Sequence, residues 1–170
     1  MIRVGLGYDS HRFNGRAGTV MLGGVAIPHR QRLVGHSDAD VLLHAIADAL
    51  LGAIGAPDLG ELFPSSNPKY RGYDSRRFVE AAYRKVKAGG WVVGNLDATV
   101  IADAPKLVPH KAAMRRTIGR LLHVPPSDVS IKGKTTEGLA PGAAGIAAHV
   151  VVLLERPSRV RTSTRTRVTS

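Results

Sequence analysis

Two short segments of the sequence combine acidic and imidazole side chains at spacings that suit a metal ion. Asp9 and His11 stand two residues apart, so in extended backbone both side chains leave the same face. His44 has Asp40 and Asp48 at four-residue spacing in a segment with helical periodicity. Two imidazoles and a carboxylate with a fourth position open form the ligand set of a catalytic zinc site. The alternatives are a hydrogen-bonded Asp9–His11 pair and a surface pair of His44 with Asp40 or Asp48.

Two further segments contain groups that suit phosphate. His36 and Ser37 stand just before the same helical segment, and backbone N–H groups at a helix start can bind a phosphate oxygen. Plain capping by Ser37 is the alternative. Residues 132–138 read KGKTTEG, where two hydroxyls and the Glu137 carboxylate suit a hydrated Mg²⁺ that bridges phosphates. An ordinary polar turn is the alternative there, since the Walker pattern of a P-loop is absent.

Strands and helices are expected to alternate along the chain. Period-two patterning predicts strands at residues 2–8, 19–27, 91–101, 128–134 and 146–155, and Gly23-Gly24 interrupts the second one as part of a hairpin. Apolar stripes predict a helix capped by Ser37 or Asp38 and ended by Gly52 and Gly55, a helix capped by Ser75, and a helix over residues 105–122. Residues 56–74 are rich in Pro, Gly, Ser, Asn and Asp, a composition that predicts a loop. The fold class expected is α/β, an α+β sandwich whose mixed sheet has helices packed on one face.

Composition limits the class of protein. The chain has 170 residues, of which 44% are hydrophobic and 22% charged, as in a single globular domain. Cysteine is absent, which excludes disulfides, thiolate metal sites and a cysteine nucleophile. We find neither an apolar run of membrane-spanning length nor a secretory signal, so the prediction is a cytoplasmic protein without a membrane partner.

The net charge of +11 points to a polyanionic partner. Residues 156–170 contain five arginines and no acid, and their composition predicts a basic, disordered C-terminal tail beyond a single domain at 1–155. The remaining excess of six charges suits a phosphorylated substrate. A nucleic-acid-binding protein is a competing function, but the sequence lacks interleaved aromatic residues for base stacking, so we expect no nucleic-acid partner.

In this order, the segments together resemble the 2-C-methyl-D-erythritol 2,4-cyclodiphosphate synthase family. The resemblance covers residues 2–155 and rests on RVGLGYDSHRF, GHSDADVLLHAIADALLGAIG, PDLGELFP, DSR, ATVIADAPKLVPH, KTTEGL and GIAAHVVVLL. It implies a phosphorus–oxygen lyase of the non-mevalonate isoprenoid pathway, a homotrimer with active sites between subunits. In the implied reaction, the 2-phosphate of 4-diphosphocytidyl-2-C-methyl-D-erythritol 2-phosphate attacks the β-phosphorus, expels CMP and closes a cyclic diphosphate. A metal-dependent phosphatase on the same scaffold is a further competing function.

The same resemblance implies roles for individual residues. Asp9, His11 and His44 match the family's zinc ligands, and Glu137 matches the ligand of a second metal, Mg²⁺ or Mn²⁺. His36 and Thr135 match the catalytic positions that hold the phosphates and flank the transition state. Substrate contacts are implied for Asp9, Ser10, His11, His36, Ser37, Asp58, Leu59, Gly60, Phe63, Pro64, Ser65, Ser66, Asn67, Ala102, Asp103, Ala104, Pro105, Lys106, Leu107, Val108, Lys134, Thr135, Thr136 and Glu137.

Overall fold

A computed structural model describes residues 1–138 and 144–157 of the chain. Most of the predicted C-terminal tail, residues 158–170, lies outside the described residues. Arg156, the first residue of the tail predicted at 156–170, belongs to the folded body, because its guanidinium lies 4.8 Å from the ring centroid of Trp91. Its backbone N–H also donates to the carbonyl of Met1 at 3.2 Å.

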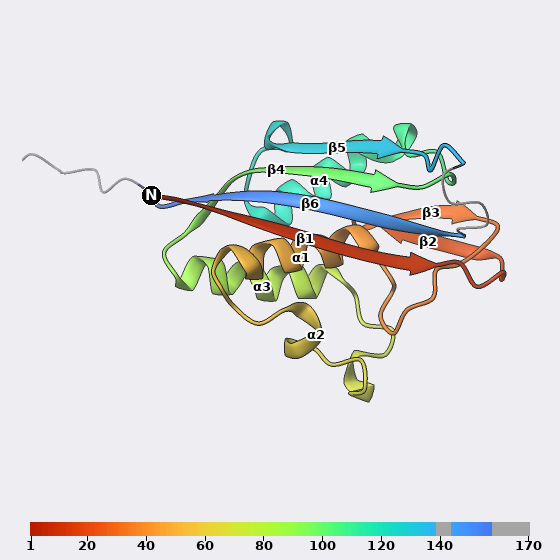
Figure 1. Ribbon diagram of the computed structural model, residues 1–170, viewed down its shortest axis with the longest axis horizontal. Coiled ribbons are helices and arrows are strands. Elements are labelled where there is room, and N and C mark those ends of the chain that lie inside the picture. The colour runs from red at the N-terminus through yellow and green to blue at the C-terminus, as the bar shows by residue number, and fades with distance from the viewer. Residues whose placement is uncertain (139–143, 158–170) are drawn as a thin grey trace, which may run out of the picture.

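Four strands form one mixed sheet. They are β1 (Ile2–Arg12), β4 (Val92–Ile101), β5 (Val129–Lys134) and β6 (Gly145–Glu155), in the order β1-β6-β4-β5 (Figure 1). The central strand β6 runs antiparallel to β1 and β4, whereas β4 and β5 are parallel. The carboxyl ends of β1, β4 and β5 therefore meet at the same edge of the sheet. The predicted mixed sheet is confirmed.

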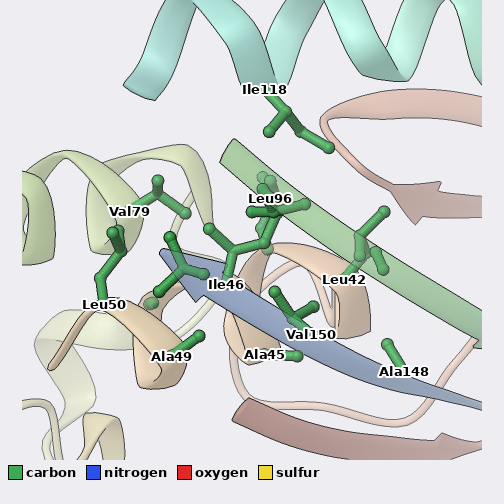
Figure 2. Close-up of a cluster of buried hydrophobic side chains, with 14 of the residues drawn as sticks. Leu42, Ala45, Ile46, Ala49, Leu50, Val79, Leu96, Ile118, Ala148 and Val150 are labelled. Carbon is green, nitrogen blue, oxygen red and sulfur yellow. The ribbon is translucent and has the colours of Figure 1, made fainter. Parts of the chain in front are cut away.

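All three long helices cover one face of this sheet. The helix α1 (Val41–Ala53) packs on β1 and β6, α4 (Lys111–Leu122) packs on β5, and α3 (Arg76–Ala88) packs against both helices. The core between the layers is built from aliphatic side chains, among them Ile46 of α1 and Val150 of β6 (Figure 2). The prediction of helices on one face is thus confirmed. Within the described residues, the helices lack the length and apolar character that crossing a membrane requires.

Within residues 1–138 and 144–157, no element covers the other sheet face, which carries apolar side chains. We call it the outer face and define it by Val4, Leu6 and Tyr8 of β1 with Val151 of β6, all of them exposed. In β1 the buried positions are instead the glycines Gly5 and Gly7, which lie against α1. The predicted strand is confirmed, but its apolar side faces away from the helices.

The helix predicted to begin at Ser37 or Asp38 begins at Val41. Asp40 is its cap, because the Asp40 carboxylate accepts the N–H of Leu43 at 3.0 Å. Ala39 has a φ of 59°, a left-handed conformation that no right-handed helix can include. The two predicted caps are therefore wrong.

Three other predicted boundaries also change. The Gly23-Gly24 interruption turns out to be the turn of a complete hairpin of β2 (Gly18–Leu22) and β3 (Val25–His29), which forms a separate sheet. The predicted loop 56–74 contains the short helix α2 (Leu59–Leu62). The third long helix begins at Lys111 and not at residue 105, because the two prolines of the segment APKLVP disfavour helical backbone in the residues before them.

Candidate metal centre and substrate pocket

The end of β1 meets the first turn of α1 because the two elements run in opposite directions in close contact. A Cβ on Gly5 would lie 1.9 Å from the carbonyl oxygen of Ala49, and one on Gly7 would lie 1.9 Å from that of Ala45. Two residues of strand advance about 6.8 Å and four residues of helix about 6 Å. The next inward position of the strand, Asp9, therefore comes opposite the helical turn that carries His44.

Three side chains converge at this point, and we call Asp9, His11 and His44 the metal triad. Asp9 Oδ2 lies 2.9 Å from His44 Nδ1 and 3.1 Å from His11 Nε2, and the two ring nitrogens are 3.3 Å apart. Ligand atoms about 2.0–2.2 Å from a tetrahedral zinc ion would be roughly 3.3–3.6 Å apart. The triad thus has the donor types and nearly the spacing of three zinc ligands, with a fourth position left for a substrate oxygen.

The Asp9 carboxylate is anionic at the centre of this group. Burial acts to raise the pKa of Asp9, but the hydrogen bonds and charges of His11 and His44 outweigh it and hold that pKa well below its usual range. Burial acts to lower the pKa of His11, whereas its contact with Asp9 raises it, and the net direction is upward. A carboxylate that stays ionised at neutral pH suits a cation between these residues.

Asp40 and Asp48 serve the scaffold rather than a surface pair with His44. The fully buried carboxylate of Asp40 accepts the N–H groups of Gly23 at 2.9 Å and Gly24 at 2.7 Å, which fixes the hairpin turn against the start of α1. Burial raises the pKa of Asp40. Asp48 accepts the N–H of Leu59 at 2.7 Å, which ties α2 to α1. The two surface-pair alternatives for His44 are therefore wrong.

The metal triad opens into a cavity of about 440 Å³, which we call the substrate pocket. It is lined by Asp9, His11, His36, Ser37, His44, Asp48, Leu59, Gly60, Phe63, Pro64, Ser65, Ser66, Tyr70 and Phe78. This set includes ten of the residues expected to contact the substrate, among them Leu59, Gly60 and residues 63–66. Neither lysine nor arginine lines the pocket within the described part of the chain.

Within residues 58–67, two members of the expected substrate set are absent from this lining and have local structural roles. Asp58 caps α2, because its carboxylate accepts the N–H of Glu61 at 2.8 Å. Asn67 caps the 3-10 turn Pro68–Tyr70 by accepting the N–H of Lys69 at 3.0 Å. His36, expected just before a helix start, instead lies exposed five residues before α1, at the wall of the pocket.

Several residues near the metal triad were missed as functional residues. Tyr70 and Phe78 line the pocket together with Asp48. The spacing of Phe78 in its helix indicated only an inward-facing position. The sequence predicts only helix-cap roles for Ser75 and Asp38, yet Ser75 contacts the ring of His44. The DSR stretch was the one sequence signal that marked this region.

The other expected site residues form a second cluster at the carboxyl ends of β4 and β5, and we define it as residues 102–108 and 134–137. Asp103 joins its two parts, because its carboxylate accepts the N–H and the hydroxyl of Thr136, each at 2.8 Å. The hydroxyl of Thr135 donates to the carboxylate of Glu137. This cluster contains Lys106 and Lys134, so the expected basic side chains are here and not in the substrate pocket.

Within one chain the second cluster is separated from the metal triad. Asp9 pairs with Ala148, Ala148 with Val100, and Val100 with Gly133 across the sheet. Three inter-strand spacings amount to roughly 14 Å, so Gly133, the β5 position that leads toward Thr135 and Glu137, is far from Asp9 across the sheet. Ser10 points to the opposite side of β1 from Asp9 and lines another cavity of about 270 Å³. His11 of the metal triad and Thr136 of the second cluster also line this cavity.

Comparison with known proteins gives one consistent result. The sequence profile of the YgbB family matches residues 2–155. The 2-C-methyl-D-erythritol 2,4-cyclodiphosphate synthase of Koribacter versatilis is 51% identical over 157 residues, which cover 92% of this chain and 99% of that protein. The enzyme of the same name from Proteus mirabilis is 47% identical over 159 residues, with 92% and 99% covered.

Solved structures agree with the sequence relatives. A structure of 2C-methyl-D-erythritol-2,4-cyclodiphosphate synthase superposes with a TM-score of 0.83 at 40% identity and covers 90% of this chain and 100% of its own. The CDP complex of IspF from Plasmodium falciparum superposes with a TM-score of 0.79 at 33% identity, with 91% and 96% covered.

Proposed function

The chain belongs to the YgbB family, and from this membership we propose that it cyclises 4-diphosphocytidyl-2-C-methyl-D-erythritol 2-phosphate to 2-C-methyl-D-erythritol 2,4-cyclodiphosphate with release of CMP. It is an enzyme of the lyase class, and the bond that it breaks makes it a phosphorus–oxygen lyase of isoprenoid biosynthesis. The observation that carries the proposal is the convergence of Asp9, His11 and His44 at the wall of a pocket of substrate size. Residues 1–155 would form the single catalytic domain.

We propose Zn²⁺ for the metal triad, because two imidazoles and one carboxylate are ligands that zinc prefers. When bound, such an ion supplies a Lewis acid that offsets phosphate charge. Glu137 of the second cluster, with its Thr135 partner, would hold Mg²⁺ or Mn²⁺ together with substrate phosphates. That ion would neutralise further phosphate charge.

The chain's own residues would act mainly by positioning the substrate. An intramolecular phosphoryl transfer needs its nucleophile held close to the phosphorus and in line with the leaving group. The attacking phosphate is already anionic at neutral pH, so no general base is required. Phe63, Tyr70 and Phe78 form an aromatic wall of the pocket, which would exclude water from the methylerythritol group. His36 and Ser37 would hold the phosphates at its rim.

The second cluster would bind the leaving nucleotide. The segment 102–108 would form the cytidine pocket, mostly with backbone groups, and Lys106 and Lys134 would offset phosphate charge. Thr135 would stand beside the transition state as a catalytic residue. Within the described residues, neither lysine nor arginine lines the substrate pocket, so the positive charge of those side chains would come from this cluster and further charge from bound metal.

We propose that the two halves of the active site come from neighbouring subunits of a homotrimer. Two observations support this assembly. Asp9 and Gly133, the β5 position that leads toward Thr135 and Glu137, are roughly 14 Å apart across the sheet of one chain. The outer face exposes a row of apolar side chains, which is the kind of surface that soluble proteins bury in an interface.

Replacing Leu6 by aspartate is expected to break the trimer. Leu6 is 67% exposed on the outer face, so the substitution leaves the fold of one chain intact but places a charge inside a subunit interface. Light scattering after size exclusion should give three times the 18.1 kDa of one chain for the wild type and one chain for the variant. Arg84→Asp, exposed on α3, is the control. A variant that keeps the wild-type mass would contradict the assembly.

Phosphorus NMR of the reaction products tests the proposed activity. A cyclic diphosphate together with CMP is the expected result with the diphosphocytidyl substrate. Inorganic phosphate would indicate the phosphatase alternative. Absence of turnover combined with salt-sensitive RNA binding would favour the nucleic-acid alternative. The cytoplasmic location stays a prediction of the sequence.

A further inference from the structure

Ser75 occupies the N-cap position of α3 without acting as a cap. Its φ and ψ of −63° and −18° are helical, and its side chain makes no capping hydrogen bond. The residue is completely buried, with 0% of its surface exposed. Burying a hydroxyl costs desolvation free energy unless the group forms hydrogen bonds. Its partners therefore indicate what this serine does.

The hydroxyl of Ser75 lies between a carboxylate and a ligand of the metal triad. Its oxygen is 2.8 Å from Nε2 of His44, whereas the other ring nitrogen, Nδ1, faces Asp9 and His11. It also contacts Oδ1 of Asp38 in a short hydrogen bond. The backbone N–H of Ser75 donates to the other oxygen of the same carboxylate at 3.2 Å. Asp38 thus holds both the backbone and the side chain of Ser75 in place.

The direction of these hydrogen bonds follows from the chemistry of the groups. An ionised carboxylate only accepts, so the hydroxyl of Ser75 must donate to Asp38. Its oxygen then accepts, and its two other neighbours are Nε2 of His44 at 2.8 Å and the hydroxyl of Ser37 at 3.4 Å. The closer of the two, Nε2–H of His44, is the donor that this geometry favours. With a cation bound in the metal triad, Nδ1 of His44, which lies 2.9 Å from Asp9 Oδ2, must carry a lone pair, and the proton of the neutral ring is then on Nε2.

We propose that Ser75, oriented by Asp38, is a positioning residue that fixes the tautomer and ring orientation of His44 for metal binding. This inference rests on the proposed metal centre. Metal-binding histidines generally donate their other ring N–H to such a partner, and loss of the partner lowers metal affinity about 10- to 100-fold.

Ser37 lies close to the same nitrogen but does not fix the direction. Its hydroxyl oxygen is 3.0 Å from His44 Nε2 and accepts the N–H of Ala39 at 3.2 Å. The carboxylate of Asp38 contacts Ser75. The direction of the hydrogen bond between the ring of His44 and its hydroxyl partner is therefore set at Ser75. Ser37 without Ser75 can donate to or accept from the ring, which leaves both tautomers of His44 available.

Zinc affinity and histidine NMR of the zinc-bound protein test this inference. Chelator competition should show binding by the wild type and binding about 10- to 100-fold weaker by Ser75→Ala. In the zinc-bound wild type, ¹⁵N shifts of the His44 ring at about pH 8 should show the proton on Nε2. In zinc-bound Ser75→Ala, that Nε2–H has lost its fixed acceptor, so its proton should exchange with water faster than in the wild type.

The control removes an equivalent bond elsewhere in the chain. The hydroxyl of Ser127 donates to Asp128 at 3.0 Å on the surface, so Ser127→Ala should leave zinc affinity and the His44 shifts unchanged. If Ser75→Ala unfolds, Asp38→Asn keeps the side-chain volume and removes the anionic acceptor that orients the Ser75 hydroxyl, and it should weaken zinc binding as well.

The outcomes separate this inference from the proposed metal centre. A wild type that binds no zinc would overturn the metal centre. A wild type that binds zinc, with Ser75→Ala equal to it within twofold, would overturn the positioning role alone. A proton on Nδ1 of His44 in the wild type would do the same.

Discussion

The His44→Ala variant should lose metal binding and metal-dependent release of CMP. His44 contributes the nitrogen that lies nearest to Asp9 Oδ2 in the metal triad, and only Asp9 and His11 remain without it. The loss in zinc affinity should exceed the roughly 100-fold that removal of an outer partner of a ligand can cost. Zinc content after dialysis and CMP release from the diphosphocytidyl substrate are the two measurements.

A second histidine provides the control for this experiment. His29 at the end of β3 contacts the backbone of Gln31 through Nδ1 and stacks on Phe13. The His29→Ala variant should keep wild-type zinc content and turnover. Undiminished turnover in His44→Ala would refute the assignment of zinc to this triad.

The Gly7→Ala variant should lose both stability and the metal triad. A Cβ at this position would lie 1.9 Å from the Ala45 carbonyl oxygen and 2.7 Å from the Ala49 backbone nitrogen. Both atoms belong to the backbone of α1, so the whole helix must move away from β1. We expect the free energy of unfolding to fall by about 3 kcal/mol or more. Urea denaturation measures that fall, and chelator competition measures the accompanying loss of zinc affinity.

A glycine-to-alanine substitution on the helix side of this contact should instead raise the free energy of unfolding. Gly52 lies in α1, and a Cβ there would meet only the carbonyl oxygen of Leu6 at 3.8 Å. Alanine is favoured over glycine inside a helix by about 0.8–1.0 kcal/mol. Gly52→Ala should therefore stabilise the protein slightly and keep zinc affinity. Equal stability of Gly7→Ala and the wild type would show that β1 does not hold α1 in the close contact seen at Gly7.

Patterns within single elements could be predicted because their causes are local. Asp9 and His11 share a face since side chains alternate along a strand, and the structure places both toward α1. The stripe of apolar residues in α1 follows from the period of the helix. The start of α1 could not be found this way, because Asp40 outcompetes Ser37 as the cap through contacts with the distant turn at Gly23 and Gly24.

The location of the net charge in the fold is a second feature that the sequence could not predict. Nine of the nineteen basic residues in 1–155 lie on α3 and α4, together with a single acid. The rest of that region has ten basic and twelve acidic residues. Composition indicated an excess that suits a phosphorylated substrate, but the excess is not at the substrate pocket. Composition carries no positions, so only the folded chain could separate the basic helices from the pocket.

By itself, the sequence determined the family, the elements and the three members of the metal triad, since each leaves a motif or a period along the chain. The tertiary structure decided how those members meet and what holds them. Gly5 and Gly7 bring α1 onto β1, and Ser75 reaches His44 from a third element. The tertiary structure also separated the second cluster from the metal triad within one chain. These are contacts between residues far apart in sequence, and their geometry depends on packing that no local pattern encodes.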